Sequence, residues 1–145
     1  MNERIERILV TTDGSDESEH AFAAMMPIVR ADDPQVTVLH VLDGPNASFE
    51  PPARIAKACS ALRENGVDAR LELREGKPAM EIVGLAAEQD LLVMSTHGRG
   101  GFKRIMLGSV TEEVIRHAEI PMLVTRPGIP VRPWNRIIVA LDGSS

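Results

Sequence analysis

Five short apolar segments that alternate with helical patterns constrain the fold of this chain more than any other feature. Two of them contain the continuous runs Ile8–Val10 and Leu91–Met94, which are typical of strands buried on both faces. Strands that alternate with helices over short connections predict a mostly parallel sheet with helices on both faces. The five segments are Ile8–Thr12, Val36–Leu42, Val67–Leu73, Leu91–Ser95 and Met122–Thr125.

The third segment alternates strictly between apolar and polar residues, so we expect it at an edge of the sheet with one face in water. Right-handed crossovers leave few topologies, and the leading one is a doubly wound sheet, which binds ligands beyond the carboxyl ends of its strands. The loops of interest therefore follow the first, second and fourth strands. Four amphipathic helices are predicted, at about Asp16–Arg30, from Pro51 to Gly66, from about Pro78, and at about Ser109–His117.

Local signals mark the ends of two of these helices. Asp16 followed by Glu19 resembles a capping box at the start of the first helix. Gly66 stands where a left-handed residue would end the second helix. Cys59 lies on the apolar stripe of that helix, which predicts a core position. As the only cysteine it excludes an internal disulfide.

The composition excludes two classes of partner. A formal net charge of −5, with three Phe, one Trp and no Tyr, offers neither the basic face nor the stacking platforms of a nucleic-acid binder. No apolar run approaches the ~20 residues that a membrane-spanning helix needs. The first residues carry charges of both signs where a signal peptide would have its apolar core. We therefore expect a cytoplasmic protein that binds neither nucleic acid nor membrane.

A repeat divides the chain. The segment Arg7–Ser15 recurs as Arg136–Ser144, and both copies end in Asp-Gly-Ser. A repeat separated by a whole domain length predicts one domain over 1–127, a Pro-rich linker over 128–135, and the first strand of a second, truncated repeat over 136–145. The alternative is a chance similarity between two apolar strands.

A glycine-rich segment, Ser95–Val110, carries the candidate site. It begins at a strand end and enters a helix at Gly108-Ser109, so its glycines let the backbone approach a ligand closely. The amide groups and positive dipole of a helix N-terminus favour phosphate, and Ser109 could either cap the helix or bond a phosphate oxygen. The segment contains neither of the common phosphate-binding motifs. The alternative is a purely structural loop.

The spacing of Gly98, nine residues and then Gly108-Ser109 resembles the nucleotide-binding pattern of the universal stress protein family, with Ser95 in place of the first glycine. Other segments are similar to the same family. They are Val10–Ser15, His40-Val41 and Pro121–Val124.

This resemblance implies a Rossmann-like, doubly wound, five-stranded parallel sheet that forms homodimers or tandem domains. In one branch of the family it implies ATP binding, with Mg²⁺ or Mn²⁺ bridging the phosphates. Asp13 would face the adenosine and the backbone of Val41 would read adenine, although Asp13 could instead start an Asx turn and Arg99 could be a solvated loop charge. The remaining implied contacts, to ribose, phosphates and the crevice wall, are Thr11, Thr12, Ser95, Gly98, Arg99, Gly108, Ser109 and Val110.

No catalytic side chain is predicted; His97 beside the glycine-rich loop could act as a general base, but loop histidines are usually structural or solvated. No metal ligand is predicted, because His20, His40 and His117 lack the spacing of a metal site. The leading hypothesis is an ATP-binding stress-response regulator that acts through nucleotide-dependent conformation or association. The alternatives are a slow ATPase or nucleotide-transfer enzyme, and a dimerisation module that binds no nucleotide.

Overall fold

A single five-stranded sheet organises the chain, in the order β3-β2-β1-β4-β5 with every pair parallel. The computed structural model describes residues 4–42, 44, 50–96 and 107–130. The predicted doubly wound fold class is confirmed. The strands are β1 (Arg7–Thr11), β2 (Gln35–Leu42), β3 (Ala69–Glu75), β4 (Leu91–Ser95) and β5 (Met122–Thr125).

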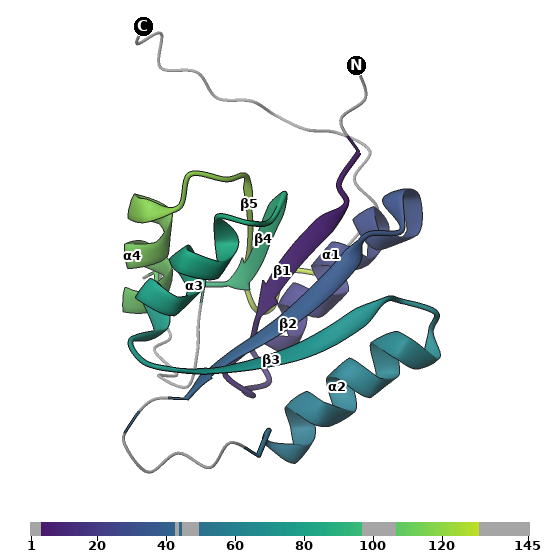
Figure 1. The fold of residues 1–145 in the computed structure, drawn as a ribbon, viewed down its shortest axis with the longest axis horizontal. Coiled ribbons are helices and arrows are strands. Elements are labelled where there is room, and N and C mark those ends of the chain that lie inside the picture. Colours follow the sequence, from purple (N-terminus) through teal and green to yellow (C-terminus); the bar gives the residue numbers. More distant parts are fainter. Residues whose placement is uncertain (1–3, 43, 45–49, 97–106, 131–145) are drawn as a thin grey trace, which may run out of the picture.

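Four helices connect the strands and cover both faces of the sheet. In Figure 1, α1 and α2 lie on one side of the sheet, and α3 and α4 lie on the other. Within the described ranges, no helix has the length and apolar character that crossing a membrane requires. The helices are α1 (Glu19–Asp32), α2 (Ala53–Glu64), α3 (Pro78–Ala86) and α4 (Ser109–His117).

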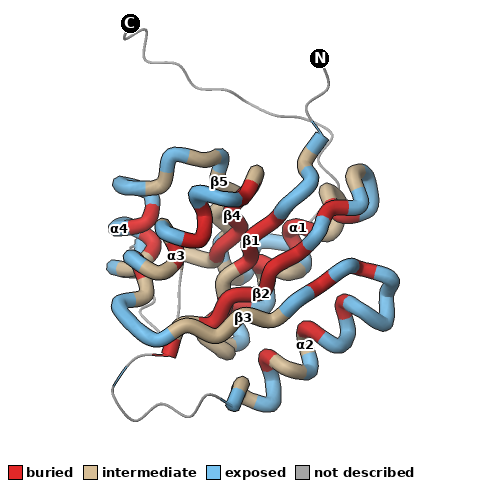
Figure 2. The backbone as a smooth tube through the Cα atoms, in the orientation of Figure 1, coloured by how far each residue is buried: buried red, intermediate tan, exposed pale blue. Residues whose placement is uncertain are grey.

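The central strand β1 contributes to two separate hydrophobic cores. Ile8 and Val10 pack into the core under α1 and α2, whereas Leu9 packs into the core under α3 and α4. All three side chains are fully buried, and Figure 2 shows the buried residues running along the middle of the sheet. A strand that must fill a core on each face cannot alternate in polarity, which explains its continuous apolar sequence.

Strand β3 lies at an edge of the sheet, as its alternating sequence predicts. It starts at Ala69, two residues later than expected, because the amide of Val67 bonds to the end of α2. Gly66 has φ +82°, its amide donates to Arg63 O at 2.9 Å, and the amide of Val67 donates to Leu62 O at 3.0 Å. These two bonds define a Schellman motif, so Val67 belongs to the helix end rather than to the strand.

The start of α1 differs from the expected capping box. The helix begins at Glu19, after a turn over residues 16–18, and Ser18 is its N-cap residue without a side-chain capping bond. Asp16 forms an ion pair with Arg54 at the start of α2. The capping-box prediction is therefore wrong, because the Ser18 hydroxyl donates to Ser15 O at 2.8 Å and a long-range ion pair holds Asp16.

Candidate functional site

The topology places the candidate site beside β1. After β3 the chain crosses from one side of β1 to the other and continues in β4, so the strand order reverses between β1 and β4. Ligands of doubly wound sheets bind outside the carboxyl ends of the strands at such a switch point. The loops of interest leave from the carboxyl ends of β1, β2 and β4, which are neighbours in the sheet. Residues 97–106 of the last loop lie outside the described residues, and with them the predicted contacts Gly98 and Arg99.

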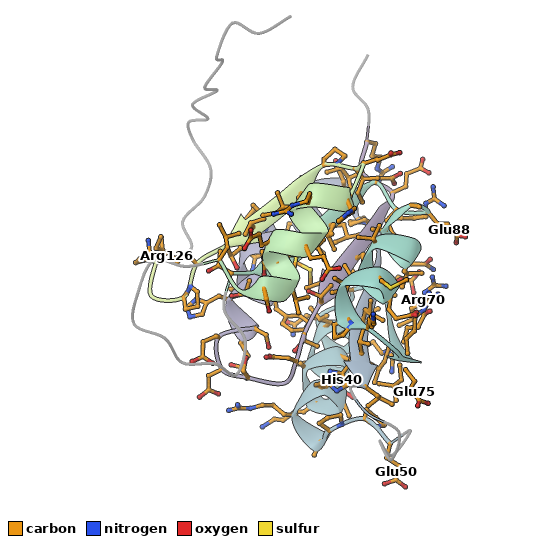
Figure 3. All side chains as sticks on the ribbon, turned by 90° about the vertical axis from the view of Figure 1, so that its left-hand side faces the viewer. His40, Glu50, Arg70, Glu75, Glu88 and Arg126 are labelled. Carbon is orange, nitrogen blue, oxygen red and sulfur yellow. The ribbon has the colours of Figure 1, made fainter. Side chains whose placement is uncertain are left out.

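Thr12, the first residue after β1, is fixed to β2 by two hydrogen bonds. Its amide donates to Leu39 O at 3.0 Å, and its carbonyl oxygen lies 2.8 Å from His40 Nδ1. A carbonyl can only accept, so His40 Nδ1 carries the hydrogen. His40 is buried near the carboxyl end of β2 and is labelled in Figure 3. The loop after β1 therefore leaves the sheet from a fixed position.

The carboxylate of Asp13 takes part in a turn. Its Oδ1 accepts hydrogen bonds from the Ser15 amide at 3.0 Å and from Ser15 Oγ at 2.5 Å. The Asx-turn alternative is thus confirmed as a geometric fact. A carboxylate has about four acceptor positions, so this turn does not exclude a ligand role. Thr11 and Asp13 are both half-buried at this end of the sheet.

Val41 lies on β2 and packs against the core under α3 and α4. It is the next-to-last residue of the strand and is half-buried, so its backbone lies close to the carboxyl edge. The structure thus places Thr11, Thr12, Asp13 and Val41 at the carboxyl ends of the neighbouring strands β1 and β2.

The end of β4 is fastened to the start of α4. The Gly108 amide donates to Thr96 O at 2.8 Å, and Thr111 Oγ1 donates to Ser95 O at 3.1 Å. These bonds hold the N-terminus of α4 beside the carboxyl end of β4. Thr111 is buried and was not predicted from the sequence, although a hydroxyl residue on the inward face of a helix is a usable signal.

Gly108 is the N-cap residue of α4, and Ser109 is the first residue of the helix. The interpretation of Ser109 as a cap is therefore wrong, which leaves its exposed side chain available for the other predicted role. The first backbone bond of the helix runs from Glu112 N to Gly108 O at 2.9 Å. The amides of Ser109, Val110 and Thr111 lie before this bond and have no acceptor within the helix.

Ser95 differs from the other predicted contacts. Its Oγ is buried and has no hydrogen-bond partner, the one such side-chain atom among the residues that the structure describes. A buried hydroxyl without a partner costs about 1–3 kcal/mol. The serine that replaces the first glycine of the family pattern is thus placed at the strand end nearest the switch point.

No group of three His, Cys, Asp or Glu side chains that could hold a metal ion occurs in the described part of the chain. Among the described residues, two pKa shifts are resolved, one in the core and one on β3 beside Val41. Burial raises the pKa of the Cys59 thiol in the core. On β3, the hydrogen bond to Glu72 raises the pKa of Arg74.

A parallel, doubly wound domain with a helix N-terminus at its switch point belongs to the Rossmann-like ligand-binding class. The model of the universal stress protein family matches residues 4–126. The chain therefore belongs to the universal stress protein family.

Similar proteins agree with this assignment. Universal stress protein MJ0531 of Methanocaldococcus jannaschii is 35% identical over 138 residues, which cover 83% of this chain and 81% of that protein. Among solved structures, hypothetical protein MJ0577 superposes with a TM-score of 0.79 at 26% identity, covering 88% of this chain and 99% of that one.

Two further solved relatives contain nucleotides. A universal stress protein in complex with cAMP has a TM-score of 0.69 at 27% identity, covering 86% of this chain and 98% of its own. The universal stress protein of Archaeoglobus fulgidus in complex with dAMP has a TM-score of 0.63 at 25% identity, covering 83% and 98%. These two proteins thus bind adenine nucleotides.

Proposed function

We propose that this chain binds ATP at the carboxyl ends of β1, β2 and β4, and that nucleotide occupancy controls its conformation or association in a stress response. The observation that carries the proposal is the attachment of α4 to β4. The 2.8 Å bond from Gly108 N to Thr96 O holds the first amides of α4 beside the switch point. Amides and dipole at a helix N-terminus bind phosphate. The nucleotides of the two solved relatives favour adenine as the base.

The proposed contacts follow the two ends of the nucleotide. Asp13 would bind the adenosine, the backbone of Val41 would read the adenine, and Thr11 and Thr12 would line the crevice. The phosphates would lie against residues 108–110, with Ser95, Gly98 and Arg99 beside them. The dipole of α4 places partial positive charge at the N-terminus of this nine-residue helix, and the effect falls off within one turn, so the negative charge of the phosphates belongs at the first turn.

Mg²⁺ or Mn²⁺ would bind chiefly through the phosphates. Mg²⁺ usually keeps several waters and takes one or two carboxylates plus phosphate oxygens, rather than a dedicated protein cage. The described residues hold no cluster of three ligating side chains. Asp13 supplies one carboxylate just beyond the carboxyl end of β1, where the phosphates are proposed to lie nearby. The metal would supply charge neutralisation of the triphosphate.

Hydrolysis is expected to be slow. A general base must lie within hydrogen-bond reach of the attacking water. His40 Nδ1 donates to Thr12 O, and Asp13 Oδ1 already accepts two hydrogen bonds. We therefore propose a binding protein whose turnover stays below roughly 1 s⁻¹, the lower range of ordinary enzymes.

We also propose that the protein is a homodimer formed through β5. This strand lies at the edge of the sheet opposite β3, and all four of its residues are only half-buried. Exposed apolar side chains lie nearby in sequence, with Ile115 46% and Ile129 57% exposed. An edge strand beside apolar surface is a natural pairing site, whereas the charged strand β3 discourages pairing.

The test is to identify nucleotide carried by the purified protein and to titrate it with ATP and Mg²⁺ by calorimetry. ATP at 100 times Kd should stabilise the fold by about 2.7 kcal/mol, which raises the Tm by several degrees. GTP is the control for base selection. Absence of bound nucleotide, of binding heat and of a Tm shift would favour the dimerisation module, whereas turnover above roughly 1 s⁻¹ would favour the enzyme.

A further inference from the structure

A chain of hydrogen bonds runs through the loop between β1 and α1. It starts at the buried hydroxyls of Thr12 and Ser18, whose oxygens lie 2.8 Å apart. Ser18 Oγ donates to Ser15 O at 2.8 Å, and the Ser18 amide donates to Ser15 Oγ at 3.3 Å. The chain ends at Asp13, where Ser15 Oγ lies 2.5 Å from Oδ1.

The direction of each proton in this chain is determined. A hydroxyl has one hydrogen to donate, and Ser18 uses its hydrogen on Ser15 O. The Thr12 hydroxyl must therefore donate to Ser18 Oγ, while Thr12 Oγ1 accepts from the Gly14 amide at 3.1 Å. Ser15 Oγ accepts from the Ser18 amide and gives its own hydrogen to Asp13.

Such an arrangement fixes a carboxylate before any ligand arrives. Two donors from Ser15, its amide and its hydroxyl, converge on one oxygen of Asp13. Hydrogen bonds to an ionised acceptor are short and roughly twice as strong as neutral ones. Ser18 in turn donates hydrogen bonds to both the hydroxyl and the carbonyl oxygen of Ser15. Ser18 is only 4% exposed and its hydroxyl also bonds to Thr12.

We propose that Ser15 is a positioning residue, which orients the Asp13 carboxylate toward hydrogen-bond donors on the nucleoside part of the ligand. This inference rests on the proposed nucleotide-binding function. A carboxylate only accepts hydrogen bonds, so its ligand partners must be donors such as sugar hydroxyls or an exocyclic amine. A carboxylate that is already oriented loses less conformational entropy when the ligand binds. This gain in affinity disappears when residue 15 no longer holds the Asp13 carboxylate.

The experiment is a double-mutant cycle read by ATP calorimetry. Ser15→Ala should weaken ATP binding about tenfold, equivalent to about 1.4 kcal/mol. In an Asp13→Ala background the same change should have no further effect, because a residue that acts through Asp13 has nothing left to position. Ser15→Thr keeps the hydroxyl and should restore most of the affinity. Ser60→Ala, on the exposed side of α2, is the matched serine control and should bind ATP normally.

Three further measurements keep the inference open to refutation. Thermal unfolding establishes that each variant is folded, and Asp13→Asn replaces Asp13→Ala if the latter does not fold. Comparing ATP with 2′-deoxy-ATP tests the 2′-hydroxyl as the partner of Asp13, since a carboxylate directed at that hydroxyl loses its preference for ATP in Ser15→Ala. Equal losses from Ser15→Ala in both backgrounds, or no loss in either, would overturn the positioning role while leaving ATP binding intact. A wild-type protein that does not bind ATP would overturn the proposed function and this inference together.

Discussion

Replacing Gly108 by Ala should separate ligand binding from folding. The backbone of Gly108 has φ −60° and ψ 147°, a conformation open to any residue. A Cβ built there would lie 3.1 Å from the carbonyl oxygen of Thr96, a contact tight enough to displace the neighbour by a few tenths of an ångström. The displaced atom belongs to the bond that fastens α4 to β4.

Two effects of this substitution on stability oppose each other. Ala reduces the entropy of the unfolded chain, which stabilises by about 0.4–1 kcal/mol where the native conformation is compatible. Ala is also a poorer N-cap residue than Gly, and the tight contact adds strain. We expect a net loss of about 1 kcal/mol or less in the free energy of unfolding. ATP affinity should fall at least about tenfold, because the first amides of α4 move away from their phosphate-binding position.

The assay pairs calorimetric titration of ATP with urea denaturation of the same protein. Gly84→Ala is the control, since Gly84 lies inside α3 and, apart from the backbone of its own helix, no atom approaches within 4 Å of its added Cβ. This control should gain about 1 kcal/mol in stability from helix propensity and bind ATP normally. If Gly108→Ala binds ATP as well as wild type, the assignment of phosphate to the start of α4 is wrong.

Three other predictions concern folding and association. Asp90→Ala should lower the free energy of unfolding, measured by urea denaturation, by about 1–2 kcal/mol. The reason is that Asp90 Oδ2 accepts hydrogen bonds from the amides of Glu6 at 3.0 Å and Arg7 at 2.8 Å. An unchanged denaturation midpoint would show that water replaces the carboxylate as the acceptor. Because burial raises the pKa of Cys59, the folded state favours the protonated thiol. The contribution of the protonated Cys59 thiol to the free energy of unfolding is therefore complete below the ordinary thiol pKa of about 8.5, and it is lost as the pH rises through the higher pKa of the folded state. Cys59→Ala should flatten this alkaline decline, and an identical slope would refute the assignment. Truncation after Pro127 should weaken association in light scattering and leave ATP binding unchanged, because the apolar segment 137–141 is then absent; equal association by the shortened protein would leave the β5 edge as the whole interface.

The fold was predictable because a strand buried on both faces has a continuous apolar sequence, whereas a strand buried on one face alternates between apolar and polar residues. The continuous runs around Leu9 and Leu92 indicated the sheet interior, and the alternating third segment indicated an edge. The end of α2 at Gly66 was also predictable, since a left-handed residue there has a local cause. The later start of β3 follows from the same motif, through the bond from Val67 to Leu62.

The details of the site were less accessible because they depend on contacts distant in sequence. His40 and Thr12 are 28 residues apart, and Thr111 and Ser95 are 16 apart, so no spacing rule joins either pair. In the sequence, His40 belonged to the family-like pair His40-Val41 and lacked metal-ligand spacing, and neither observation indicated its contact with Thr12. Its actual contact fixes the loop that carries Asp13, a role visible only once β1 and β2 are paired.

The position of β1 in the middle of the sheet has a consequence for synthesis on the ribosome. The first three strands emerge in order and can pair as β3-β2-β1, since each lies beside its predecessor. The far edge of β1 must then wait for β4, which is made only after α3. A nascent chain of this family thus carries an open, apolar strand edge for part of its synthesis, a state that exposes it to aggregation. Because β1 and β4 meet at the switch point, the proposed nucleotide site can be completed only after β4 and the start of α4 have been made, when β5 alone remains to be added.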